Sequence, residues 1–225
     1  MNFFADLLDL VLPQACAGCE RPSVLLCATC LAFLVAAPAR PAWPEAVPAG
    51  LPRPWAVASY AGPVRAVIVA HKERARTSLA VPLGRALARS VRSAVSLSEP
   101  LVVVPVPSSR RSVRLRGHDP TRRMAEVAVR ELQNAGAPVT LLQALRHRRK
   151  VADQASLPAS RRASNLAGAL EPLPGLPLAG RAVVLADDVI TTGSTLVEAA
   201  RALRTSGAQV LAAAAVAATP RHHPT

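Results

Sequence analysis

The stretch from Arg181 to Thr195 constrains the fold of this chain more than any other part of the sequence. It reads Arg-Ala-Val-Val-Leu-Ala-Asp-Asp-Val-Ile-Thr-Thr-Gly-Ser-Thr. The apolar run predicts a buried strand over 181–186, and the apolar spacing that follows predicts a helix over 194–205. Two acidic residues and a turn of small, hydroxyl-bearing residues lie between them. Open α/β sheets bind ligands at the carboxyl ends of their strands, so we expect a ligand at this junction.

The turn after the two acids has the composition of a phosphate-binding site. N–H groups at the helix start, the positive end of the helix dipole and several hydroxyls would together hold a phosphate. Gly193 would let the backbone approach the ligand closely. Asp187 and Asp188 would repel a phosphate, so sugar hydroxyls, a metal-bound water or a developing cation are their natural partners. The segment therefore predicts a sugar-phosphate site. A plain capped helix is the alternative, but capping needs one hydroxyl residue rather than several.

The run from Val183 to Thr195 resembles, without an insertion, the motif with which type I phosphoribosyltransferases bind phosphoribosyl pyrophosphate (PRPP). The resemblance implies that the acids hold the ribose hydroxyls and that the loop holds the 5-phosphate. The PRPP-binding residues that it assigns here are Asp187, Asp188, Val189, Thr191, Thr192, Gly193, Ser194 and Thr195.

Strand-like and helix-like patterns alternate from Trp55 onward. We expect strands over 57–60, 101–106, 139–142, 181–186 and 210–217, and helices over 64–73, 79–95, 121–134 and 194–205. Strands separated by helices imply right-handed crossovers and a parallel sheet covered on both faces. The predicted fold class is α/β, a Rossmann-like parallel-sheet domain over 55–219 with a tail at 220–225. Residues 37–54 contain six prolines, so we expect a linker or arm without a folded element there.

The cysteines form two CxxC pairs within residues 1–36, namely Cys16, Cys19, Cys27 and Cys30. Two such turns can complete a tetrahedron of thiolates around Zn²⁺, which predicts a small N-terminal zinc-binding module. Four thiolates leave no coordination position open, so the zinc would be structural. A disulfide would need an oxidising compartment. Redox chemistry and unpaired core thiols are the remaining alternatives.

The net charge is +13, and Lys72 and Lys150 are the only lysines among 27 basic residues. Such a charge attracts nucleic acid, an acidic membrane surface or phosphorylated metabolites. An arginine bias with abundant Ala and Pro is also typical of a GC-rich genome. The apolar N-terminal stretch has no preceding basic residue and contains acids, so we expect no signal peptide. The later run 210–218 is too short to span a bilayer. The sequence predicts a cytoplasmic protein without membrane insertion.

A four-cysteine module followed by a type I phosphoribosyltransferase domain resembles the ComF family, also described as GntX-like. Other residues carry the same resemblance: Val104, Pro105, Val106, Pro107, Arg110, Arg111, Arg114, Arg116, Gly117, Gln154, Arg161 and Asn165. The chain departs from the family after Gly117, where His118, Asp119 and Pro120 stand in place of an aromatic residue and Asn-Gln.

The resemblance also implies roles for the middle of the chain. Pro105 to Ser109, with Pro107, Ser108 and Ser109 as ligand-binding residues, would form the pyrophosphate loop. Arg114 and Arg116 would lie on a mobile loop that closes over the substrate, and with Asp187 and Asp188 they complete the catalytic set. A solvated basic loop is the alternative for the arginines. We interpret His118 as a surface or packing residue rather than a general acid, and we expect His71 and Lys72 to reach the site from the early helix.

The family resemblance, together with the net charge, implies two functions. The first is a PRPP-binding phosphoribosyltransferase, a pentosyltransferase that uses Mg²⁺ and acts on a nitrogenous acceptor for which the sequence holds no motif. The second is a competence-related protein that handles incoming single-stranded DNA or contacts the competence machinery, with no need to turn over PRPP. Aromatic residues are scarce, which counts against binding of bases by stacking. A PRPP-sensing regulator is compatible with both functions, and an oligomer is compatible with the sequence.

Overall fold

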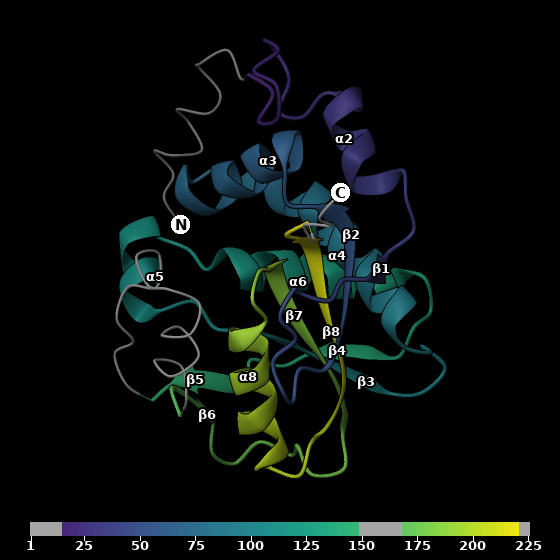
Figure 1. Cartoon of the computed structure of the whole chain (residues 1–225), viewed down its shortest axis with the longest axis vertical. Coiled ribbons are helices and arrows are strands. Elements are labelled where there is room, and N and C mark those ends of the chain that lie inside the picture. Colours follow the sequence, from purple (N-terminus) through teal and green to yellow (C-terminus); the bar gives the residue numbers. More distant parts are fainter. Residues whose placement is uncertain (1–14, 149–167, 221–225) are drawn as a thin grey trace.

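A six-stranded sheet forms the centre of the molecule in the computed structural model, which describes residues 15–148 and 168–220 (Figure 1). The strand order is β1-β2-β8-β7-β3-β4, and all neighbours are parallel except β1 and β2. The strands of this sheet are β1 (Arg40–Pro41), β2 (Arg53–Ser59), β3 (Leu101–Pro105), β4 (Val139–Leu141), β7 (Ala182–Ile190) and β8 (Gln209–Ala218). A separate antiparallel pair consists of β5 (Leu145–His147) and β6 (Leu170–Pro172).

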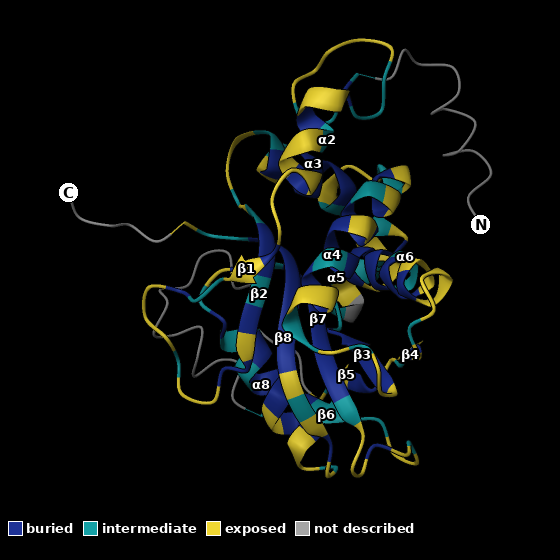
Figure 2. Cartoon of the chain, turned by 90° about the vertical axis from the view of Figure 1, so that its right-hand side faces the viewer, coloured by how far each residue is buried: buried dark blue, intermediate teal, exposed yellow. Residues whose placement is uncertain are grey.

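Helices cover both faces of the sheet. They are α2 (Ala28–Val35), α3 (Gly62–Glu73), the 3-10 turn η1 (Thr77–Leu79), α4 (Ala80–Ala94), α5 (Arg110–Arg116), α6 (Pro120–Asn134) and α8 (Ser194–Arg204). Alternate residues of β7 enter different cores: Val184 and Ala186 pack with α3, α4 and α6, whereas Val183 and Leu185 pack with α8 and the β5–β6 pair. The central strands are buried on both faces, as Figure 2 shows for β7 and β8. This burial explains their unbroken apolar sequences.

Small residues allow the layers to approach closely. Strand β8 is mostly alanine, and Ala213 to Ala217 are almost fully buried. On the helical side, a Cβ atom added at Gly84 would lie 2.5 Å from Cβ of Val127, so α4 and α6 approach each other at this glycine. The core is therefore assembled from many small side chains, as the low aromatic content indicates.

The α/β fold class and the alternation of elements expected from the sequence are confirmed, with ends that differ by a few residues. The expectation of no folded element in 37–54 is wrong, because β1 pairs antiparallel with β2 at the sheet edge and β2 itself begins at Arg53. An edge strand tolerates proline, since one side of it needs no ladder hydrogen bonds. Among the described residues, none of the helices is long and apolar enough to cross a membrane.

Candidate functional site

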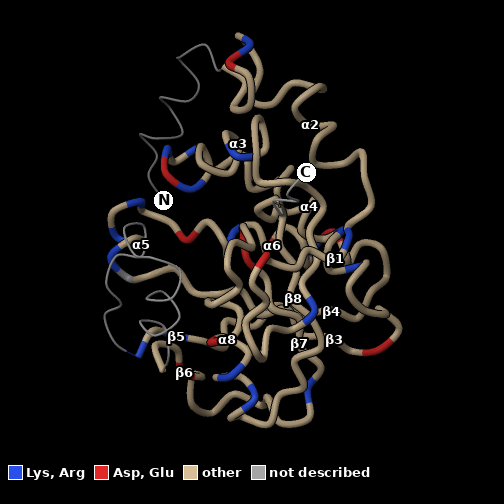
Figure 3. The backbone as a smooth tube through the Cα atoms, in the orientation of Figure 1, with Lys and Arg blue, Asp and Glu red and all other residues tan. Residues whose placement is uncertain are grey.

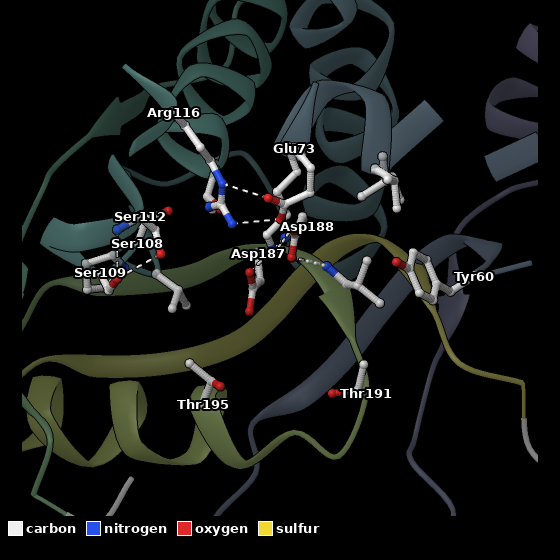
Figure 4. Close-up of a pocket in the computed structure, with 17 residues that line it drawn as sticks. Tyr60, Glu73, Ser108, Ser109, Ser112, Arg116, Asp187, Asp188, Thr191 and Thr195 are labelled. Atoms are coloured by element: carbon white, nitrogen blue, oxygen red, sulfur yellow. Dashed lines mark hydrogen bonds and ion pairs between the residues drawn. The ribbon is translucent and has the colours of Figure 1, made fainter. Parts of the chain in front are cut away.

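The two acids lie within β7, which continues past them to Ile190. Successive strand residues point to opposite faces of the sheet. Asp188 therefore points to the side of α3 and is 5% exposed. Its Oδ2 accepts a hydrogen bond from Nζ of Lys72 at 2.5 Å. Asp187 points to the opposite side, into a cavity (Figure 4).

The two carboxyl groups have opposite protonation tendencies. Burial and the adjacent charge of Asp188 raise the pKa of Asp187 well above its usual range. Burial alone would also raise the pKa of Asp188, but the charge and hydrogen bond of the Lys72 ammonium outweigh it and lower that pKa. Asp188 is thus the ionised member of the pair, and Asp187 the member that holds its proton more tightly.

The turn after β7 leads directly into α8. Gly193 is the N-cap residue and has φ 76°, a left-handed conformation that favours glycine. A Cβ atom there would lie 3.0 Å from both δ-carbons of Leu51, so the proline-rich arm covers the turn at this point. The hydroxyls of Thr192 and Ser194 bond to each other at 3.0 Å. Within the described part of the chain, the hydroxyls of Thr191 and Thr195 have no hydrogen-bond partner.

The segment after β3 forms the opposite rim. Ser109 caps α5 by accepting a hydrogen bond from the N–H of Ser112 at 3.1 Å. The Ser108 hydroxyl donates to Oδ1 of Asp119 at 3.0 Å, and Asp119 in turn caps α6. Both serine hydroxyls therefore also hold the local structure together.

The arginine segment is helical rather than a loop, because α5 spans Arg110–Arg116 and ends at Gly117 with φ 74°. Arg116 donates two hydrogen bonds to the Glu73 carboxylate. Its Nε lies 3.0 Å from one carboxylate oxygen, and a terminal guanidinium nitrogen lies 2.7 Å from the other. It lines the cavity, whereas Arg114 is exposed and does not. The structure therefore brings Arg116 to the site but not Arg114.

These segments enclose a cavity of about 430 Å³ at the carboxyl end of β7 (Figure 4). Eleven of the residues expected from the sequence line it: Lys72, Val106, Pro107, Ser108, Ser109, Arg116, Asp187, Asp188, Val189, Thr191 and Thr195. Thr192, Gly193 and Ser194 shape the turn without lining the cavity. Sequence reasoning did not identify Tyr60, Ile68, Val69, Glu73, Ser112 and Thr121, which also line it. No local motif marks these residues, since only the fold brings them to β7.

Two histidines join the end of α3 to the start of α6. His71 is 1% exposed and His118 is 6% exposed, with ring centroids 5.7 Å apart. The Nε2 atom of His118 lies 3.2 Å from the carbonyl oxygen of His71, and the Nε2 atom of His71 lies 3.3 Å from that of Pro120. Burial lowers the pKa of His71. His118 is therefore a packing residue, and His71 does not line the cavity although its neighbour Lys72 does.

The four cysteine sulfur atoms lie within 4.8 Å of one another. Zinc bonds of about 2.3 Å in a tetrahedron would place sulfur atoms about 3.8 Å apart. The sulfurs of Cys19 and Cys27 are 3.6 Å apart, and the N–H of Cys27 donates to Cys16. Burial would raise the pKa of Cys16, but backbone donors outweigh it and lower that pKa to about 6. The cluster fits a tetrahedral metal ion.

A glycine makes the close approach in this cluster. A Cβ atom at Gly18 would lie 2.7 Å from the Cys30 sulfur and 3.2 Å from Cβ of Pro63 in α3. The first CxxC turn thus touches both the second pair of cysteines and the helix behind them. Three of the residues that carry the family resemblance, Gln154, Arg161 and Asn165, lie outside the described residues.

Comparisons with known proteins agree with this geometry. Residues 122–224 match the family model described as "Phosphoribosyl transferase domain". The chain is 32% identical to the DNA utilization protein YhgH of Escherichia coli (strain K12) over 208 residues, which cover 87% of this chain and 85% of that protein. The Salmonella typhi protein of the same name is 31% identical over the same shares. Adenine phosphoribosyltransferase of Mycobacterium avium (strain 104) is 56% identical over 45 residues, so the match spans only 25% of that enzyme.

Proposed function

Since the chain belongs to the ComF family, whose members join a cysteine cluster to a phosphoribosyltransferase domain, we propose that it binds PRPP in the cavity at the end of β7. The observation that carries this proposal is that Asp187 lines the same cavity as Thr191 and Thr195, from the turn that follows it. A carboxyl group next to a phosphate-binding turn suits a phosphorylated pentose.

The 5-phosphate would bind at the start of α8. The first N–H groups of a helix have no partner within the helix, and the helix dipole favours an anion there. The Thr191 and Thr195 hydroxyls add donors from the same turn. Asp187 faces the ribose in this arrangement. Because its pKa is raised, it can donate a hydrogen bond to a ribose hydroxyl as well as accept one.

The diphosphate would bind between the serine segment and α5. Ser108, Ser109 and Arg116 line this part of the cavity. Arg116 is held by Glu73, so the diphosphate must compete with that carboxylate for the guanidinium. Mg²⁺ bound together with the substrate would supply positive charge that offsets the charge of the diphosphate. Mg²⁺ commonly binds through substrate phosphates and waters, which suits a site where one of the two acids already has an ammonium partner.

The reaction that suits this arrangement is a pentosyl transfer to a nitrogenous acceptor. A bond forms between the acceptor nitrogen and C1 of the ribose, and the bond from C1 to the diphosphate oxygen breaks, with its electron pair leaving on the diphosphate. The proton that the acceptor nitrogen loses passes to water or to the departing diphosphate. The protein's residues supply position and charge and form no covalent intermediate. Arg116 would offset the charge of the leaving diphosphate.

The cysteine cluster would hold a structural Zn²⁺. Four sulfur ligands fill a tetrahedral site and leave no position for a substrate. The cluster lies against α3 at Pro63, so the metal would support the helix that carries Lys72 and Glu73.

A second candidate function is the handling of single-stranded DNA, which the similarity to a DNA utilization protein and the net charge of +13 favour. Basic residues occur on α5 beside the cavity, where Arg111 and Arg114 are exposed (Figure 3). Gel shifts with single-stranded DNA across a salt series test this function, with Arg111→Gln plus Arg114→Gln compared with Arg85→Gln on α4. No shift at low salt, or equal shifts for both variants, argues against a DNA-binding α5.

Isothermal calorimetry with PRPP and Mg²⁺ tests the main proposal. Thr195→Val removes one hydroxyl at the cavity, and Thr205→Val, at the other end of α8, is a matched control because its hydroxyl bonds only to Ala202 in the described chain. We expect about a tenfold loss of affinity for Thr195→Val and none for the control. The absence of any heat with the unchanged protein would refute PRPP binding.

Release of pyrophosphate from PRPP, measured against a panel of bases and ammonia, tests turnover separately. Release that depends on one acceptor identifies a transferase. If PRPP binds but no acceptor leads to pyrophosphate release, the protein binds PRPP without turning it over. The second candidate function allows this outcome.

A further inference from the structure

Among the described residues, Lys72 is the cation that forms an ion pair with Asp187 or Asp188. It lies in the last turn of α3, its ammonium is 2.5 Å from Asp188, and it lines the same cavity as Asp187. Its side chain is 36% exposed, whereas that of Asp188 is 7% exposed. The ammonium therefore contacts a buried carboxylate and still reaches the cavity.

We propose that Lys72 is a positioning residue of the PRPP site, which keeps Asp188 in place beside Asp187 and turns its remaining N–H groups toward the bound sugar phosphate. An ammonium has three donors. One is used on Asp188, which leaves two for oxygen atoms of a ligand in the cavity. This inference rests on the proposed binding of PRPP.

The charges at the end of β7 explain why a cation is needed there. Two adjacent, poorly solvated carboxyl groups disfavour each other's ionisation. The Lys72 ammonium stabilises one charge, so Asp188 stays fixed as an acceptor and Asp187 remains available to the ligand. Without the Lys72 ammonium, the two carboxyl groups would either carry a net negative charge or bind a second proton. Either change would weaken the binding of an anionic sugar phosphate.

The neighbours of Lys72 hold it in position. The carbonyl oxygen of His71 lies 3.2 Å from Nε2 of His118, and Glu73 binds Arg116 through two hydrogen bonds. The residues before and after Lys72 are thus both tied to the segment from Arg116 to His118. The end of α3 is also a favourable place for a cation, because the carbonyl end of the helix dipole is negative.

The residue type is itself informative. The chain has 27 basic residues and only two are lysines, so arginine is its usual cation. Lysine carries a compact charge on a flexible stem, whereas arginine carries a wide planar fork. The other buried acid among the described residues, Glu198, is paired with an arginine, Arg201, whereas Asp188 is paired with a lysine. This difference indicates that the space beside Asp188 suits an ammonium rather than a guanidinium.

Calorimetry with PRPP and Mg²⁺ on the full chain tests this inference with four proteins: the unchanged chain, Lys72→Met, Lys72→Arg and Arg65→Met. Arg65 is an exposed residue of the same helix that does not line the cavity, so Arg65→Met controls for loss of one positive charge from α3. We expect Lys72→Met to lose at least about tenfold in affinity, Lys72→Arg to recover part of that loss, and Arg65→Met to stay within about twofold.

Thermal melting of Lys72→Met, Asp188→Asn and the double variant separates a folding defect from a site effect. We expect Lys72→Met to lower the melting temperature by about 4 °C or more, and Asp188→Asn in the same chain to restore part of it, because the unpaired carboxylate is then gone.

The outcomes separate this inference from the proposed function. If the unchanged protein binds PRPP and Lys72→Met binds it equally well, the role of Lys72 is refuted while PRPP binding stands. If Lys72→Met and Arg65→Met lose the same affinity, the effect is a general loss of charge and the inference also fails. If the unchanged protein gives no heat, both proposals fall together.

Discussion

The two walls of the cavity are built in different ways. The β7–α8 wall, residues 187–195, is one continuous segment, and in the described chain its Thr191 and Thr195 hydroxyls have no protein partner. The α3–α5 wall combines Lys72 and Glu73 with Arg116, and each of these charges is already paired, with Asp188 or within the wall. The first wall can therefore bind a ligand with little rearrangement. The second must exchange the Arg116–Glu73 ion pair for a contact with the ligand, whereas Lys72 can keep its contact with Asp188.

The largest expected effect concerns a region that belongs to neither wall, the cysteine cluster. Chelation of the proposed Zn²⁺, or Cys27→Ser, should lower the free energy of unfolding by about 3 kcal/mol or more, because the free energy of metal binding contributes to folding. PRPP affinity should change by no more than about threefold, since none of the cysteines lines the cavity. Metal analysis, melting and calorimetry on the same samples measure both effects. A larger loss of affinity would show that the walls depend on the metal.

A substitution in the first wall should have the next largest effect. Gly193→Ala puts a Cβ atom at φ 76°, 3.0 Å from Leu51, in the turn that we propose holds the phosphate. We expect a loss of about 1 kcal/mol in stability and of about a hundredfold in PRPP affinity. Gly136→Ala is the control, because its φ is 82° but nothing lies within 4 Å of the added atom. Equal affinities for the two variants would contradict a phosphate at this turn.

A substitution in the second wall should strengthen ligand binding rather than weaken it. Glu73→Gln removes the carboxylate that competes with a diphosphate for Arg116. Because Glu73 is half exposed, the gain should be modest, about threefold tighter binding of pyrophosphate in calorimetry. Glu126→Gln, which removes a comparable exposed partner from Arg122 on α6, should leave the affinity unchanged. Weaker binding in Glu73→Gln would mean that Arg116 needs Glu73 to reach the ligand.

The smallest expected effect is a pH dependence from the histidine that anchors the second wall. Burial lowers the pKa of His71, and the positive charges of His118 and Arg123 act in the same direction. The unfolded chain therefore binds the proton more readily. The stability contribution is complete above the ordinary pKa of about 6.5 and is lost as the pH falls below it. We expect His71→Gln to flatten the stability profile between pH 7 and 5 by less than about 1 kcal/mol, as denaturant unfolding would measure. If His71→Gln leaves the pH profile of stability unchanged, other groups are responsible for the pH dependence.

The same contrast explains how much the sequence could predict. The residues of the first wall are contiguous, so a strand, two acids and a helix start determine their own relative positions. Glu73 and Tyr60 reach the cavity only because α3 and β2 pack beside β7, and no spacing along the chain encodes that contact. The helix α5 had local signals, since Ser109 caps its start and Gly117 ends it, but the family resemblance favoured a loop. The short edge strand β1 depends on its partner β2 and has no pattern of its own.

A crystal structure of the chain with PRPP and Mg²⁺ is the most direct test of the account. We predict the 5-phosphate at the N–H groups of residues 191–195, the ribose hydroxyls against Asp187, and the Lys72 ammonium still on Asp188. A 5-phosphate bound on the α3–α5 wall, with the turn before α8 free of ligand, would contradict it.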